Sequence, residues 1–213
     1  DPLVEGKLDL QALAKQYWGD ADWVPEKYLT GATSKRGSVI TFLDFIDKNF
    51  GRGFRNQTLR RFQVTESAFK DPLAPINMRL GIDIASFLLK RFKDDETILA
   101  MGRHSVLVNH KSPMGQELAQ ARNLSELFVM MAESVLGKYV TQNFQWKATF
   151  LNAFQCRLEG RPVDELLPLV GRDYLYSREA CLIRTGFTSS IPCYMGYPPL
   201  EITKSKCVAQ GDS

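Results

Sequence analysis

Few residues of this chain have the types and spacing that catalysis requires. The sequence has two histidines, His104 and His110, and no GxSxG, HExxH, GxxxxGKS/T or CxxC motif. His104 stands among apolar residues of a predicted helix, and His110 stands beside Lys111 in a predicted loop. We therefore expect His104 to be an ordinary packed or surface residue and His110 to be solvated, and neither to act as a general base.

A cluster of three acidic residues, Asp94, Asp95 and Glu96, could bind a cation. Adjacent carboxylates diverge around the start of a helix, however, where they accept hydrogen bonds from free backbone N–H groups and complement the helix dipole. The sequence therefore predicts a helix cap here rather than a metal site.

A basic stripe is the strongest candidate for nucleic-acid binding, because cations meet phosphates and aromatic rings stack on bases. Its members are Arg52, Arg55, Arg60 and Arg61, interleaved with Phe54 and Phe62. The stripe is short, and the sequence contains no recognisable helix-turn-helix or other nucleic-acid-binding motif. A solvated surface or an interdomain contact is therefore the better interpretation. We do not expect this segment to bind nucleic acid directly.

Aromatic residues recur with period two after residue 142. Phe144, Trp146 and Phe150 alternate with polar residues, and the alternation resumes through Phe154 and Cys156. Such spacing indicates two strands joined by a turn. The aromatic face could line a ligand cavity or simply form one side of the core. Both interpretations stay open, because a ligand cavity is often a region of the core that side chains do not fill completely.

The elements before this point are predominantly helical, because apolar residues recur at the helical period. We expect an N-terminal helix through Leu8, Leu13 and Tyr17 and a short segment after Pro25. The further expectations are a loop at 31–38, a helix at 39–50 ended by Gly51 and Gly53, helices at 76–91 and 96–107, a loop at 110–116 and a helix at 123–140.

A helix rich in small residues is predicted from Ser177 to about Tyr194, where Gly186 and its neighbours allow close approach of another helix or a ligand. Final strands are expected at 200–206 and 207–211. The fold class is thus α+β, with helices packed on a short antiparallel sheet. Two prolines near residue 72 suggest an N-terminal helical segment at 1–75 and a second unit at 76–213.

The composition indicates a folded protein. The 213 residues are 44% apolar and 24% charged, which allows a large core as one domain or two smaller ones. A net charge of +3, evenly spread, does not require nucleic acid or an anionic membrane as partner. No apolar run approaches the roughly 18 residues of a membrane span, and DPLVEGKLDL lacks the pattern of a signal peptide.

Four cysteines in a chain of this length do not indicate a disulfide framework. The apolar neighbours of Cys156 and Cys181 favour reduced, buried thiols, which suit a cytoplasmic protein. A chain that begins at Asp1 without Met and ends CVAQGDS looks excised from a longer protein. We therefore expect a neighbouring segment to carry the output activity.

The most specific pattern starts at Cys181: CLIRTGFTSS, then YMG, an alternating segment, and CVAQGD from Cys207. It resembles the C-terminal half of the V4R (4-vinyl reductase) domain, most closely the effector-sensing domains of bacterial phenol- and toluene-responsive activators. The shared features are Cys-x4-Gly-aromatic, Met-Gly near the helix end, and a Cys-x-x-x-Gly turn 26 positions after the first cysteine. The resemblance covers 177–213; residues 76–176 follow it only in element order, and residues 1–75 match nothing.

The resemblance implies an α+β dimer related to vesicle-tethering Bet3-type subunits, with a buried pocket for a small aromatic or hydrocarbon ligand. We expect the pocket at Trp146, Phe150, Phe154, Cys156, Phe187 and Tyr194. The family's ligand-contacting His and Trp have no counterpart at matching positions, so phenol specificity is not implied.

The family also holds zinc through two cysteines that match Cys181 and Cys207. Its glutamate ligand, three residues before the second cysteine, is replaced by Lys204, and a fourth ligand would fall beyond Ser213. Tetrahedral zinc needs four donors. Zinc is therefore an uncertain cofactor, and the alternative is that both cysteines are small buried residues at a helix–strand junction.

The leading hypothesis is a non-enzymatic, ligand-sensing regulatory domain of a cytoplasmic bacterial protein, acting as a homodimer and signalling to an output module, such as a transcriptional regulator. A second hypothesis is a scaffold or tethering subunit of the same fold that binds only protein. A reductase or lyase is suggested only by the domain's historical name, and the poverty of histidine and the absence of a cofactor loop argue against it.

Overall fold

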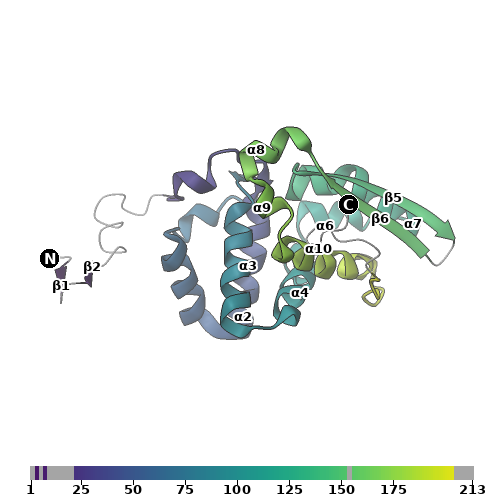
Figure 1. The fold of residues 1–213 in the computed structure, drawn as a ribbon. Helices are drawn as coiled ribbons and strands as arrows, with labels where there is room; N and C mark the ends of the chain where they lie inside the picture. The colour runs from purple at the N-terminus through teal and green to yellow at the C-terminus, as the bar shows by residue number, and fades with distance from the viewer. Residues whose placement is uncertain (1–2, 5–6, 9–21, 153–154, 204–213) are drawn as a thin grey trace.

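The computed structural model describes residues 3–4, 7–8, 22–152 and 155–203. It confirms the α+β class, with helices packed against a short antiparallel hairpin (Figure 1). The strands pair as β1 (Leu3–Val4) with β2 (Lys7–Leu8), β3 (Ser34–Lys35) with β4 (Pro75–Ile76), and β5 (Phe144–Asn152) with β6 (Gln155–Pro162).

The described helical elements fall into two groups along the chain. Before the hairpin lie η1 (Glu26–Tyr28), α2 (Arg36–Phe62), η2 (Ser67–Phe69), α3 (Arg79–Phe92), α4 (Asp95–Arg103), α5 (Ser105–Asn109), α6 (Pro113–Leu118), α7 (Leu124–Met130) and the π-helical η3 (Met131–Val140). After it lie η4 (Asp164–Leu166), α8 (Leu167–Val170), α9 (Arg172–Leu175), α10 (Arg178–Ser190) and η5 (Ile191–Met195).

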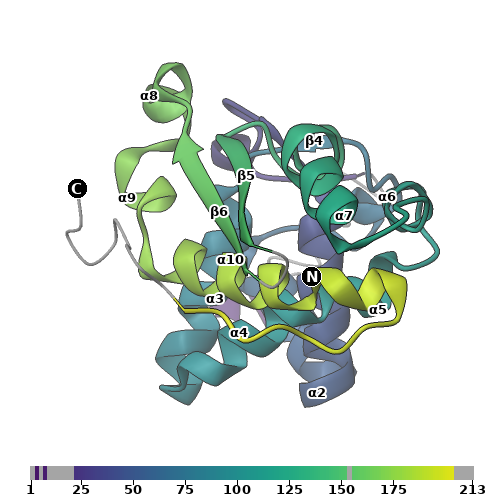
Figure 2. The same ribbon diagram turned by 90° about the vertical axis from the view of Figure 1, so that its right-hand side faces the viewer.

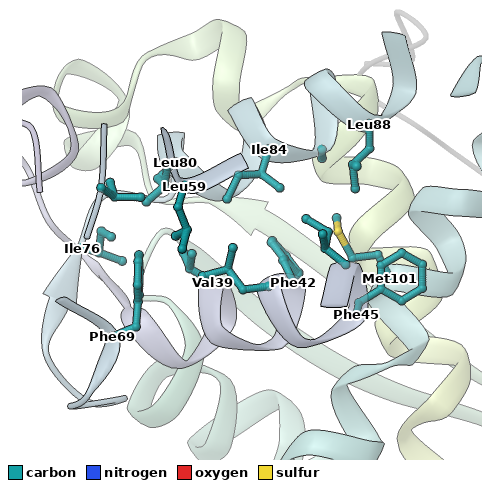
Figure 3. Packing of buried hydrophobic residues seen from close by; sticks show 14 of the residues in the cluster. Val39, Phe42, Phe45, Leu59, Phe69, Ile76, Leu80, Ile84, Leu88 and Met101 are labelled. Carbon is teal, nitrogen blue, oxygen red and sulfur yellow. The ribbon is translucent and has the colours of Figure 1, made fainter. Parts of the chain in front are cut away.

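The larger apolar core lies between α2 and α3 (Figure 3). Val39, Phe42 and Ile46 recur at the helical period on α2 and are all buried. Val39 and Phe42 face Leu80 and Ile84 of α3, which are also buried. This cluster draws residues from both sides of residue 75, so the two sequence segments share one core.

Helix α2 extends further along the chain than predicted, because a second helical segment follows the first one directly after a kink at Gly51. Its backbone adopts φ 83° and ψ 163°, outside the helical region, and the chain resumes a helix that continues to Phe62. A positive φ is accessible to glycine at little cost because it has no Cβ. The prediction that a helix ends at Gly51 is therefore confirmed, whereas Gly53 lies inside a second helical segment that was not predicted.

The predicted cap at the acidic cluster is confirmed, and a similar cap begins a later helix. Asp94 accepts hydrogen bonds from the backbone N–H groups of Glu96 and Thr97, and Asn123 accepts one from Glu126 at the start of α7. The predicted loop at 110–116 was wrong: its second half begins α6, which Ser112 caps through the Gly115 N–H and where Pro113 occupies the first turn.

The small residues of α10 allow a close approach to α4, as predicted (Figure 2). A Cβ built on Gly186 would lie 2.0 Å from the Leu99 carbonyl oxygen, and one built on Gly102 would lie 2.4 Å from that of Ile183. Paired glycines thus bring the two helix backbones together at a distance that no larger residue permits.

The predicted strand pair is confirmed as the β5–β6 hairpin. Trp146 pairs with Gly160 and Phe150 with Cys156, and a register shift follows between Phe150 and Asn152. Trp146 packs against the second apolar cluster, which belongs mainly to α6, α7 and η3. The hairpin extends beyond these helices (Figure 1), so its aromatic face is covered only near its base.

Several predictions at the two ends were wrong or fall outside the described residues. Leu8 belongs to a strand pair and not to a helix, and Ser34–Lys35 form a strand within the predicted loop at 31–38. No strand forms at 200–203. Leu13, Tyr17 and the strand predicted at 207–211 lie outside the described residues. In the part of the chain that the structure describes, no helix is both long and apolar enough to cross a membrane.

Candidate ligand cavity

A cavity of about 230 Å³ lies where α2, α3, η3, β5 and α10 meet. Its wall is predominantly apolar. The apolar side chains that line it are those of Phe42, Pro72, Leu73, Met78, Ile82, Pro113, Met114, Leu136, Val140, Phe144, Trp146, Ala180, Ile183 and Phe187. Cavities of this kind are the usual sites for small ligands.

Trp146 reaches the cavity because β5 places it opposite a glycine. A Cβ on Gly160 would lie 2.7 Å from the Trp146 ring, so only glycine leaves room for the indole at this register position. Phe144 lies beside it, with ring centroids 6.0 Å apart. The Trp146 Nε1 atom is buried and meets no hydrogen-bond acceptor among the described residues, and a buried donor without a partner is costly.

The neutral polar groups of the wall are bonded to one another. Asn109 Nδ2 donates to Thr41 Oγ1 at 3.2 Å and to Ser105 Oγ at 3.1 Å, and Thr41 donates to the Gly37 carbonyl at 3.0 Å. Ser34, another lining residue, donates to Thr141 Oγ1 at 2.9 Å. These groups stabilise the wall by satisfying each other, which leaves the surface facing the cavity largely apolar.

Arg184 is a lining residue that the sequence analysis missed. Its Nε donates to the Ala180 carbonyl at 2.9 Å and its Nη2 to the Leu175 carbonyl at 3.3 Å. The guanidinium carbon lies 4.3 Å from the centroid of the Phe144 ring. An arginine in the middle of a helix rich in small residues was the available signal, but the sequence did not show which way that helix faced.

The described residues among those predicted to bind ligand separate into three groups. Trp146 and Phe187 line the cavity. Cys156 and Tyr194 belong to the adjoining apolar cluster but not to the lining, and burial raises the pKa of both side chains. Phe150 is 37% exposed near the tip of the hairpin. Phe154 lies outside the described residues.

His104 is a packed residue rather than part of the cavity wall. It is buried, with Nε2 2.6 Å from Asp44 Oδ2 and its ring against Phe45 at a centroid distance of 5.6 Å. Burial alone would raise the pKa of Asp44, but the contacts with His104 and Lys48 outweigh it and lower that pKa. His110 is exposed.

The basic stripe is partly neutralised by an acidic neighbour. Arg52 and Arg55 both form ion pairs with Glu66, at 2.7 and 2.8 Å. The aromatic members turn inward: Phe54 stacks on Phe87 of α3 with centroids 5.6 Å apart. Rings held in this way do not present faces for base stacking.

The zinc hypothesis cannot be built from the described residues. They contain no group of three or more His, Cys, Asp or Glu side chains placed to hold a metal. Cys156 and Cys193 are half-buried free thiols, and Cys181 is half-buried as well. Cys207 and Lys204 lie outside the described residues, and we derive no chemistry through a metal.

Comparison with known proteins identifies no relative: no family model, curated protein or solved structure matches the chain. The fold and the site therefore define an α+β domain with an apolar cavity.

Proposed function

We propose that the chain is a regulatory domain that senses a small apolar or aromatic molecule. The observation that carries this proposal is the cavity of about 230 Å³, with an apolar wall and a buried, unbonded indole N–H at Trp146 among the described residues. A ligand with one acceptor would bury its apolar body and satisfy this donor. The resemblance of the motif from Cys181 to the V4R sensing domains supports the same class.

The mechanism we propose is a population shift. Helix α10 contributes Leu182 and Ile183 to the core between α2 and α3, and Phe187 to the second cluster. A ligand between these clusters would favour one arrangement of α10, because an equilibrium shifts toward the state that binds the ligand better. In this proposal the domain works as a cytoplasmic homodimer, and α10 passes the change to an output module, such as that of a bacterial transcriptional regulator.

The proposal is tested with 2-naphthamide, a neutral aromatic probe, by isothermal titration calorimetry. We expect one probe to bind per chain. Val140→Trp should abolish binding because it fills the cavity from η3, whereas Leu107→Trp, on a side chain 70% exposed in α5, should leave it unchanged. Lack of binding by the natural chain, with no small molecule seen in its native mass spectrum, would favour a protein-binding scaffold.

A further inference from the structure

The outer edge of the β5–β6 hairpin is unpaired. Strand β6 pairs with β5 and with no other strand among the described residues, and the hairpin extends beyond the covering helices (Figure 1). Helix α7 and η3 adjoin β5, so the open edge of the hairpin runs along β6. A free edge presents a row of backbone N–H and C=O groups that can pair with another strand.

The ladder of the hairpin shows which backbone groups of β6 face outward. The Val163 N–H donates to the Asn143 carbonyl at 3.0 Å, and opposite residues of an antiparallel pair alternate between hydrogen-bonded and non-hydrogen-bonded pairs. Counting along the register from this bond, Cys156, Leu158 and Gly160 stand in non-hydrogen-bonded pairs. Their N–H and C=O groups therefore point away from β5, and no backbone group of another described element reaches them.

Charged side chains of alternating sign follow this edge on one face of the hairpin. Arg157, Glu159 and Arg161 lie on the face opposite that of Trp146, because successive strand residues point to opposite faces. Both arginines are exposed, and Glu159 is partly exposed. Charges on an edge strand normally oppose pairing with a second copy. Here the alternation of sign makes pairing depend on register, because one register places opposite charges across from each other.

We propose that β6 pairs antiparallel with β6 of a second copy of this chain, about a two-fold axis at Leu158. This register places Arg157 opposite the partner's Glu159. The outward groups of Cys156 then meet those of the partner's Gly160, and those of Leu158 meet the same groups of the partner's Leu158. The contact is self-complementary, as a two-fold dimer requires. The inference rests on the homodimer of the proposed function, for which it specifies the interface.

Other symmetric registers are less favourable. An axis at Glu159 would place two carboxylates opposite each other and Arg157 opposite the partner's Arg161, and like charges directly opposite destabilise a sheet. An axis at Arg157 would likewise bring two guanidinium groups together. An axis at Gly160 would need a backbone N–H from Pro162, which has none. Charge and backbone geometry therefore select the same register.

Sedimentation velocity over a range of protein concentrations tests the interface. We expect the natural chain to dimerise in a concentration-dependent manner, because one strand edge is a small interface. Leu158→Pro should abolish dimerisation, since it removes an outward N–H while the ladder bonds to β5 come from the residues on either side. Leu158→Val keeps the N–H and should dimerise as the natural chain does. Circular dichroism confirms that each variant is folded.

Two charge reversals test the register. Glu159→Arg alone should weaken the dimer about tenfold or more, because arginine then stands opposite arginine, and Arg157→Glu alone should weaken it similarly. Mixed together, the two variants should form a heterodimer, because both cross-strand pairs are then of opposite sign. Native mass spectrometry with one variant isotopically labelled detects this species. Arg60→Glu, at an exposed position of α2, is the control for net charge and should leave the dimer unchanged.

The outcomes separate the interface from the proposed function. If the natural chain dimerises and folded Leu158→Pro and Glu159→Arg dimerise equally well, the β6 interface is wrong while the homodimer stands. If the two charge variants form no heterodimer, the register is wrong. A natural chain that stays monomeric at every concentration overturns the interface and the homodimer together, whereas the sensing role is decided separately by the binding of 2-naphthamide.

Discussion

At the scale of single residues, buried amides determine how the segments around the cavity are joined. Asn77 is fully buried, and its Nδ2 donates to the carbonyl of Thr30 at 2.8 Å and to that of Leu169 at 3.3 Å. Its Oδ1 accepts from the Arg79 backbone N–H at 3.0 Å. One side chain thus connects the segment after η1, the start of α3 and helix α8.

We expect Asn77→Ala to lower the free energy of unfolding by about 3 kcal/mol, because it leaves buried backbone groups without partners. Asn77→Asp should cost more, since its carboxylate would face the carbonyl oxygens of Thr30 and Leu169. Urea unfolding followed by circular dichroism measures both changes. Exposed Gln57→Ala serves as the control and should change stability by less than about 0.5 kcal/mol. A similarly small effect of Asn77→Ala would contradict the assigned role.

The contact between Asp44 and His104 predicts a dependence on pH. Because the pKa of Asp44 is lower in the folded protein, its contribution is present above the unfolded pKa of about 4 and disappears as the pH falls through the folded value. Asp44→Asn should therefore cost about 1 kcal/mol at pH 7, a value reduced by partial exposure. Chemical denaturation between pH 7 and pH 3 should show this difference shrinking below pH 4. Exposed Asp22→Asn is the control, and a difference that grows on acidification would refute the prediction.

At the scale of elements, periodicity predicts which face of a segment is buried but not how far its neighbours reach. The alternation of Trp146 and Phe150 correctly placed both on one face of the hairpin. It could not show that the covering helices end before Phe150, which is 37% exposed. Helix α6 was missed because its six residues are too few to display a period, although Ser112 and Pro113 were a readable start signal.

The kink in α2 can be tested by comparing the same substitution at two glycines, Gly51 and Gly53, which lie two residues apart. Gly51→Ala should cost about 1–2 kcal/mol because φ is positive there, although the added methyl group meets no atom within 4 Å. Gly53→Ala also meets nothing within 4 Å and has no positive φ. It should instead stabilise by about 0.5–1 kcal/mol, as alanine does in an exposed helix. Thermal and urea unfolding measure both, and equal signs would contradict a kink at Gly51.

At the scale of the whole molecule, the cavity is formed by segments that are distant in the sequence. Its wall joins Phe42 of α2, Ile82 of α3, Val140 of η3, Trp146 of β5 and Phe187 of α10. The sequence analysis selected Trp146 and Phe187 because aromatic spacing and the motif from Cys181 highlight them. The contributions of α2 and α3 depend on tertiary packing, and no local pattern distinguishes a helix that lines a cavity from one that fills a core.

This arrangement predicts that a ligand will protect only part of the molecule from local opening. Two apolar clusters meet around the cavity, and α10 contributes to both. A saturating probe stabilises the states that keep the cavity closed by RT ln(1 + [L]/Kd), about 2.7 kcal/mol at a hundredfold excess over Kd. Amides that exchange through opening of the cavity should therefore slow about a hundredfold, while those exposed by smaller motions elsewhere should not change.

Hydrogen exchange with and without 2-naphthamide tests this expectation. Peptides from η3, β5 and α10, which line the cavity, should gain protection, whereas peptides from α7 and α8, which do not line it, should change little. In Val140→Trp the probe should have no effect on any peptide, because the tryptophan occupies the cavity. Uniform slowing over the whole chain would contradict partial opening and would show that the two clusters separate only when the entire domain unfolds. Selective slowing would identify α10 as the element through which occupation of the cavity changes the contact between the clusters.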